Sequence, residues 1–177
     1  MNNLKLILII WGLLHSLSVK AEDRFNLTSN ALGHAIGFFN LEFSYKISDH
    51  WTLGLTYADG KTKVNDIDIS GSTSGIITRR YFLPAFDKSS WYLVGSADKR
   101  NLYANSTDSN KTYTGVYKDW VYSAGAGYHW FWDSFNISLG LLVTNQTTLK
   151  LKDSNGFEYK NQINPSVGID FTIGGKF

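Results

Sequence analysis

Residues 157–177, "FEYKNQINPSVGIDFTIGGKF", alternate between apolar and polar side chains almost without a break. Successive side chains of a β-strand point to opposite faces, so a period of two predicts a strand with one apolar face and one polar face. The apolar residues all take odd positions: Phe157, Tyr159, Ile163, Val167, Ile169, Phe171, Ile173 and Phe177.

The same alternation recurs along the chain and predicts eight strands. Aromatic residues make up 15% of the sequence and there are only two prolines, which also favours strands. The predicted strands are 24–31, 36–47, 51–59, 73–83, 91–103, 116–131, 135–152 and 157–177.

The second face of these strands is small and polar rather than densely charged, which favours a lipid-facing barrel over a soluble sandwich with the same alternation. We therefore predict an all-β fold, a transmembrane antiparallel up-and-down β-barrel of eight strands. Because "IITRRYFL" alternates poorly, the sequence leaves open which of Arg79 and Arg80 faces inward; we assign Arg80. The predicted interior polar network is Glu42, Arg80, Asp98, Arg100, Asp119, His129 and Asp170.

Aromatic residues gather beside the predicted short turns at 48–50, 84–90 and 132–134. Such positions are typical of the aromatic girdles at the two membrane interfaces. Longer polar loops are predicted at 60–72 and 104–115, and short turns opposite long loops place both termini in the periplasm. The predicted girdle includes Trp51, Trp91, Trp120, Trp130, Trp132 and Phe135, together with Tyr81 and Phe86.

The N-terminus has the pattern of a secretory signal peptide: a basic Lys5, an apolar run, and a small-residue cleavage site ending at Ala21. Residues 1–21 are predicted to be removed, leaving one domain, residues 22–177. Cleavage would remove Lys5 and Lys20, so 15 basic residues would face 15 acidic ones. Such a neutral chain does not favour nucleic acid as a partner. The absence of cysteine excludes disulfides and thiolate metal sites.

The chain resembles the small eight-stranded outer-membrane barrels of Gram-negative bacteria, the class of the OmpA membrane domain, OmpX and OmpW. The terminal "VGIDFTIGGKF" is similar to the C-terminal strand that the barrel-assembly machinery of that class recognises, with Phe171, Ile173 and Phe177 as the assembly signal. The segments at 37–60 and 78–97 also look like members of this group. The resemblance implies an outer-membrane location, with lipid, lipopolysaccharide and the assembly machinery as partners.

The sequence does not favour an enzyme. His34, His50 and His129 lack the spacing of a metal site, and no cofactor is predicted. The lipid A deacylases among such barrels carry a His-x-Ser pair in a strand, whereas His129-Trp130-Phe131 lacks the serine. A lipid A-modifying activity is therefore the least favoured alternative.

Two other functions stay open. Eight strands leave room for side chains but not for an aqueous channel, which favours a structural or surface-interaction role without an open pore. The alternative, implied by the resemblance to OmpW, is passive transport of small hydrophobic compounds. The predicted contact surface for an extracellular partner is a hairpin projecting from the membrane at 145–165, turned at Asn155-Gly156. Its surface residues are Leu149, Leu151, Asn155, Gly156, Phe157 and Tyr159.

Overall fold

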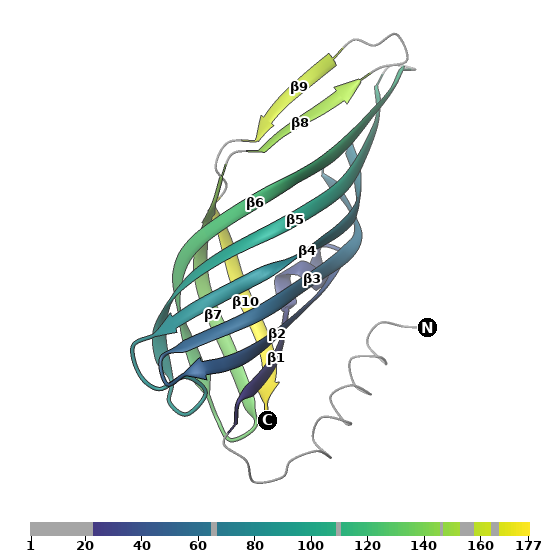
Figure 1. Cartoon of the computed structure of the whole chain (residues 1–177). Coiled ribbons are helices and arrows are strands. Elements are labelled where there is room, and N and C mark those ends of the chain that lie inside the picture. The colour runs from purple at the N-terminus through teal and green to yellow at the C-terminus, as the bar shows by residue number, and fades with distance from the viewer. Residues whose placement is uncertain (1–22, 65–66, 109–110, 146, 153–157, 164–166) are drawn as a thin grey trace.

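The computed structural model describes residues 23–64, 67–108, 111–145, 147–152, 158–163 and 167–177. Within these residues the chain forms a closed antiparallel barrel of eight strands (Figure 1). Each barrel strand pairs with its neighbour along the chain, and β1 pairs with β10 to close the wall. The barrel strands are β1 Phe25–Asn30, β2 Phe38–Ser48, β3 Trp51–Val64, β4 Ile67–Tyr81, β5 Ser90–Asp108, β6 Lys111–Phe131, β7 Phe135–Thr144 and β10 Val167–Lys176.

The alternating pattern separates the two faces of the wall. Inward-pointing residues are even-numbered in β1, β2, β3, β5, β7 and β10, and odd-numbered in β4 and β6. The outward positions carry exposed apolar side chains over most of the circumference, including Leu53, Ile76, Leu93, Tyr122, Leu141 and Ile169. The predicted polar-in, apolar-out arrangement is therefore the arrangement in the structure.

The last two predicted strands, 135–152 and 157–177, are each split in two. β7 ends at Thr144 and β10 begins at Val167, while a separate hairpin is formed by β8 (Thr147–Lys152) and β9 (Glu158–Ile163). β8 leaves the β7 direction and lies beside β6, where Thr114 pairs with Lys152. Alternation continues through both segments, so the side-chain pattern could not reveal the break. The predicted turn residues Asn155 and Gly156, and Phe157, lie outside the described residues.

The predicted loops at 60–72 and 104–115 are wrong, because the residues of these segments that the structure describes, 60–64, 67–72, 104–108 and 111–115, are strand. β3 and β4 remain paired as far as Val64 and Ile67, and β5 and β6 as far as Asp108 and Lys111. The polar composition of these segments indicates solvent around them rather than irregular backbone. Here Thr, Ile, Val and Tyr supply the β propensity that the loop prediction overlooked.

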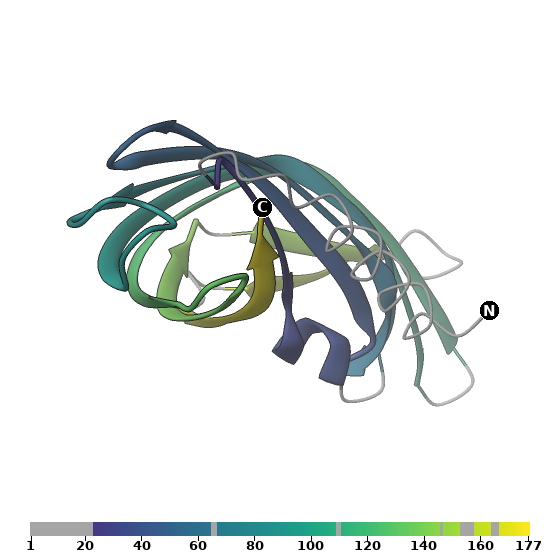
Figure 2. The same ribbon diagram turned by 90° about the horizontal axis from the view of Figure 1, so that it is seen from below.

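The two ends of the barrel differ (Figures 1 and 2). At one end, here the turn end, lie the connections between β2 and β3, β4 and β5, and β6 and β7, together with the start of β1 and the end of β10. At the other, the hairpin end, β3 to β6 extend beyond the rest of the wall and β8 and β9 lie beside them. The two ends thus differ in how far the strands extend, and not in the length of the connections between paired strands.

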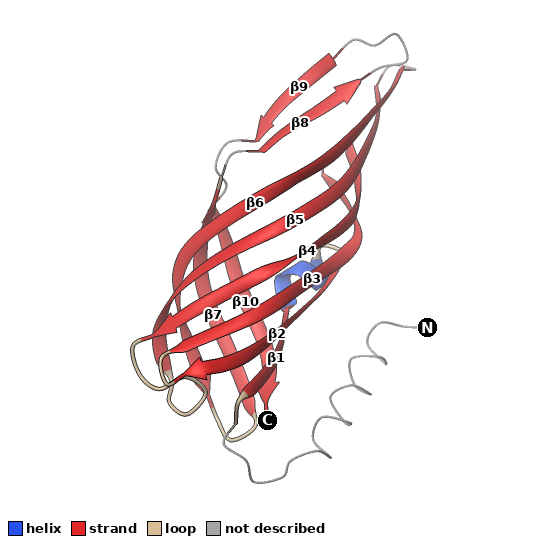
Figure 3. Cartoon of the chain, viewed as in Figure 1, coloured by secondary structure: helices blue, strands red, loops and turns tan. Residues whose placement is uncertain are grey.

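The connection between β1 and β2 contains the helix α2 (Ala31–Ala35), coloured blue in Figure 3. The Asn30 side chain caps it by accepting a hydrogen bond from the Gly33 backbone N–H at 2.9 Å. The chain leaves the helix through Gly37 at φ +91°, a conformation that favours glycine, and a Cβ there would also meet the Lys61 carbonyl oxygen. No helix in the described part of the chain is long and apolar enough to cross a membrane.

Candidate functional site in the barrel interior

A buried charge cluster joins three strands across the middle of the barrel. The Arg79 guanidinium on β4 donates to both carboxylate oxygens of Glu42 on β2, with Nη2 2.9 Å from Oε2. Asp170 on β10 lies farther away, its Oδ2 at 3.6 Å from Nη2. Glu42, Arg79 and Asp170 are only 8%, 3% and 7% exposed. A bidentate pair of this kind is strong and directional, and its members need one another once they leave water.

The assignment of Arg80 to this interior is wrong, because Arg79 points inward and Arg80 is exposed on the outer face. The register explains the difference: Thr52 of β3 is buried and pairs with Arg79, so Arg79 takes the inward position on β4. Because Ile76, Ile77 and Thr78 follow one another, the sequence of this strand does not show which alternate residues face inward. Pairing with the clearly alternating β3 would have resolved it.

A chain of hydrogen bonds fills the space between the charge cluster and the turn end. The Tyr81 hydroxyl lies 2.9 Å from His129 Nδ1, and His129 Nε2 lies 2.9 Å from the Asn136 side-chain oxygen. The Asn136 amide then donates to the Asn26 oxygen at 2.7 Å. Because the Asn136 oxygen can only accept, Nε2 carries the ring proton and Nδ1 accepts from Tyr81. Both nitrogens of His129 are thus used in structural hydrogen bonds.

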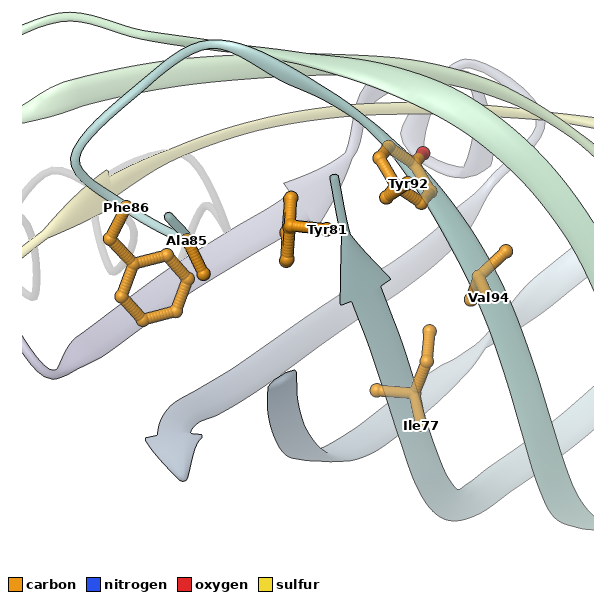
Figure 4. Close-up of a cluster of buried hydrophobic side chains, with 6 residues drawn as sticks. All are labelled: Ile77, Tyr81, Ala85, Phe86, Tyr92 and Val94. Atoms are coloured by element: carbon orange, nitrogen blue, oxygen red, sulfur yellow. The ribbon is translucent and has the colours of Figure 1, made fainter. Parts of the chain in front are cut away.

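The turn between β4 and β5 closes this end of the barrel. Ala85 and Phe86 are fully buried and pack in a cluster with Ile77, Tyr81, Tyr92 and Val94 (Figure 4). Phe86 has φ 69°, a conformation uncommon for a residue other than glycine, and Lys176 Nζ donates to its carbonyl oxygen at 2.7 Å.

The assignment of Tyr81 and Phe86 to the aromatic girdle on the outside of the barrel, at the short turns, is therefore wrong. The sequence places them beside a turn, but the turn folds inward and buries both side chains.

A cavity of about 560 Å³ lies between the charge cluster and the hairpin end. Its lining includes Glu42, Asp98, Arg100 and Asp170, which the sequence assigned to the interior. Asp119, the cross-strand partner of Arg100, is exposed and does not line the cavity. Many of the other lining residues carry hydroxyl or amide groups, and the rest are mainly apolar. The hydroxyl and amide residues include Thr28, Asn30, Asn40, Thr56, Thr73, Ser96, Ser123, Thr144 and Thr172.

The wall is incomplete beside this cavity. β1 pairs with β10 only as far as Asn30 and Thr172, so β10 from Val167 to Phe171 is paired on the β7 side alone within the described residues. Helix α2 contacts both β2 and β10 here, next to the end of β1 (Figure 2). The cavity lining correspondingly includes Leu32, Gly33 and Ile36 from this connection.

A serine–histidine contact anchors this connection, and the sequence did not indicate it. Ser29 Oγ lies 2.6 Å from His34 Nε2 and 2.5 Å from the Asn40 carbonyl oxygen. His50 is elsewhere: its Nδ1 donates to the Tyr81 carbonyl at 3.2 Å at the turn end. Among the described residues, no group of three His, Cys, Asp or Glu side chains could hold a metal ion. Ser29 and His34 are five residues apart, on either side of the end of β1, and this spacing matches no sequence motif that would have indicated the contact.

The remaining predicted girdle residues lie on the outside. Trp51, Trp91, Trp120, Trp130 and Trp132 are exposed, Trp91 most of all at 63%, and Phe135 stacks on Trp132 with ring centroids 5.7 Å apart. Trp91, Tyr128 and Trp130 form a continuous aromatic group near the turn end. Trp120 lies ten residues along β6 from Trp130, toward the hairpin end.

The terminal strand seals the wall. Phe25 and Phe177 exchange two backbone hydrogen bonds of 2.9 Å, and their rings stack at 5.9 Å between centroids. Ile173 is exposed on the outer face, and Phe171 is partly exposed beside it.

Comparison with known proteins agrees with this architecture. The DUF3575 family, described as a protein of unknown function, matches residues 6–169. The chain belongs to this family. A sequence search of curated proteins finds no match.

Two solved structures show how this DUF3575 member resembles known barrels. The N-terminal β-barrel domain of Pseudomonas aeruginosa OprF matches with a TM-score of 0.60 at 13% identity, covering 88% of this chain and 98% of that one. The E. coli outer membrane protein W, solved by NMR, matches with a TM-score of 0.54 at 14% identity, covering 90% of this chain and 100% of that one. Both similarities establish the eight-stranded barrel fold predicted from the sequence.

Proposed function

We propose that the protein is an integral outer-membrane barrel with a structural or surface-interaction role and no open aqueous pore. The outward face supports a lipid environment: apolar side chains cover most of the circumference, far more than a soluble monomer normally exposes. With the aromatic group of Trp91, Tyr128 and Trp130 near the turn end, this face has the composition of a lipid-facing band. In this proposal the turn end and both termini lie in the periplasm.

The main observation against an open pore is that side chains fill the half of the interior near the turn end. From the Glu42–Arg79 pair to Phe86 at the turn end, the inward side chains are buried and hydrogen-bonded or packed together. Water and ions that enter the cavity from the hairpin end meet this layer. Passive transport of small hydrophobic compounds is the alternative function. Several lining residues are apolar, among them Leu32, Ile36 and Leu142, but the filled layer leaves such a compound no path to the turn end.

The proposal is tested by conductance. The refolded residue 22–177 protein, inserted into a planar lipid bilayer, is expected to give no steady open-pore current, because the plugged half leaves no continuous water path. A liposome-swelling assay with small sugars provides the parallel measurement for neutral solutes. Stable single-channel steps in most insertions, together with swelling, would contradict the proposal.

The β8–β9 hairpin is the proposed contact surface of the hairpin end. Its register pairs Leu151 with Tyr159 and Lys150 with Lys160. β9 is the last strand of the sheet and pairs only with β8 among the described strands, so one of its backbone edges is available to a partner. On β5 and β6 nearby, Ala104, Tyr117 and Val121 form a separate buried cluster.

Replacing residues 148–160 with an Asn-Gly turn is expected to leave the barrel folded and remove its surface contacts. The hairpin contributes no strand to the closed wall, so the heat-modifiable gel band should persist. Adhesion of cells that carry the wild-type protein, the shortened variant or no protein measures the effect. The matched control shortens the β3–β4 extension by replacing 62–69 in the same way. Adhesion that depends on the protein and survives loss of residues 148–160 would refute this role.

A further inference from the structure

We propose that the cavity between the charge cluster and the hairpin end binds a small organic cation with two or more separated ammonium groups. The inference concerns the open half of the barrel, whereas the absence of a pore rests on the filled half. It starts from carboxylate groups that the protein itself leaves without a full set of partners.

Asp98 on β5 is the first of these groups. Its side chain lines the cavity and the residue is only 9% exposed. Its two oxygens accept hydrogen bonds from the Thr56 hydroxyl at 2.7 Å and the Ser96 hydroxyl at 2.8 Å. Within the described residues it forms no ion pair. A carboxylate can accept about four hydrogen bonds, and an ionised one in a buried site is costly without a cation, so Asp98 has both capacity and need for a cationic donor.

Asp170 on β10 supplies the second group. Asn30 Nδ2 donates to its Oδ1 at 3.1 Å, but its Oδ2 accepts no hydrogen bond and lies 3.6 Å from a guanidinium that is already committed to Glu42. Thr28 on neighbouring β1 also lines the cavity and is 3% exposed, and its buried hydroxyl has no hydrogen-bond partner among the described residues. This side of the cavity thus has two buried acceptors, the Thr28 hydroxyl and Asp170 Oδ2, that no described protein group uses and that a ligand would reach after a local side-chain movement.

The charge balance around the cavity also favours a cation. Glu42, Asp98 and Asp170 line it, while Arg100 is the one basic residue in the lining and Arg79 lies behind Glu42. Three carboxylates therefore face two guanidinium groups. A bound ammonium group would offset the remaining negative charge, and the burial of Glu42, Asp98 and Asp170 limits how far water screens that charge.

The distribution of the acidic groups over three strands indicates the kind of cation. They come from β2, β5 and β10, and no three acidic or histidine side chains in the described residues approach closely enough for one metal ion. Carboxylates on separate strands fit separate ammonium groups, each of which has three N–H donors for the surrounding hydroxyls. A volume of about 560 Å³ is within the range of small-molecule sites.

The experiment measures binding of spermidine to the folded residue 22–177 protein in nanodiscs by isothermal titration calorimetry at low ionic strength. Saturable 1:1 binding is expected, with none for neutral 1,8-octanediol and weaker binding for Mg²⁺. Asp98→Asn should weaken spermidine binding about tenfold or more, because it removes a charge-assisted hydrogen bond. Asp59→Asn is the matched control: Asp59 is exposed on the outer face of β3, three residues from Thr56, and its loss should change the affinity less than about twofold.

A second readout on the unaltered protein keeps the test decisive if a variant folds poorly. In NMR spectra of the wild-type protein, spermidine should shift the backbone amides of Thr56, Ser96 and Asp170 and leave those of Lys61 and Lys63 unchanged. Absence of saturable binding, equal loss in Asp98→Asn and Asp59→Asn, tighter binding of Mg²⁺ than of spermidine, or shifts confined to the outer strands would each overturn the proposal.

Discussion

Replacing Arg79 with methionine is expected to destabilise the folded barrel by about 3–5 kcal/mol, because it leaves Glu42 and Asp170 buried without their cation. The neighbouring Arg80→Met should cost less than about 1 kcal/mol, since Arg80 is exposed on the outer face. Adjacent residues of the same type thus provide an internal control. Urea unfolding in lipid bilayers, followed by tryptophan fluorescence, measures the difference.

Restoring the balance of charge should recover much of this loss. The triple variant Glu42→Gln, Arg79→Met and Asp170→Asn contains no buried ion, and replacing a complete buried ion pair with neutral groups is often close to neutral for stability. We therefore expect the triple variant to be more stable than Arg79→Met alone. Equal stability of Arg79→Met and Arg80→Met would show that the charge cluster does not hold the strands together.

The two arginines also show what the sequence could and could not predict. Strong alternation in β2, β3, β7 and β10 was sufficient for the barrel, and the interior positions of Glu42 and Asp170 follow from it. In β4 the consecutive residues Ile76, Ile77 and Thr78 remove the contrast between faces, and only the pairing with β3 fixes the phase. When a strand alternates weakly, its pairing with a neighbouring strand therefore decides which of its residues face inward.

The errors at the two ends of the barrel have a different origin. At the turn end, the backbone conformation at Phe86 carries an aromatic ring inward, and a sequence offers no sign of a positive φ at phenylalanine. At the hairpin end, the outward side chains become polar while the backbone pairing continues to Val64 and Asp108. Hydropathy reports the surroundings of a strand and not its length.

The lining of the candidate cavity could be predicted from the sequence only in part. The residue types at its lining follow largely from alternation on eight strands, but their proximity depends on the incomplete pairing between β1 and β10 and on the position of α2. Neither the end of β1 at Asn30 nor the Ser29–His34 contact has a periodic signal. The sequence therefore predicts a polar interior, and the structure adds which acceptors remain without partners.

Changing Phe177 to aspartate is expected to reduce the assembled protein in cells to a minor fraction. Phe177 is the point where the last strand meets the first: its backbone exchanges two hydrogen bonds with Phe25, and its ring contacts those of Phe25 and Phe43. The neighbouring Lys176 also forms an ion pair with Asp23 at 2.9 Å. Aromatic pairs contribute about 0.5–1.5 kcal/mol each beyond their buried area, so the variant also loses part of the contact that closes the wall.

Comparing folding in cells with folding in detergent separates closure from recognition by the assembly machinery. Phe82→Asp is the matched control, because Phe82 is an exposed aromatic residue beside a turn and takes no part in the β1–β10 seam. If Phe177 acts as an assembly signal, Phe177→Asp should refold in detergent with a modest loss of stability and yet give little heat-modifiable protein in outer-membrane fractions. Equal losses of folded protein in cells and in detergent would show that Phe177 acts through closure of the barrel alone. Normal outer-membrane levels of Phe177→Asp would contradict both closure and recognition as roles of this side chain. The hydrogen bonds at this seam involve only backbone atoms, so the side chain can be changed while the terminal pairing that closes the barrel is retained.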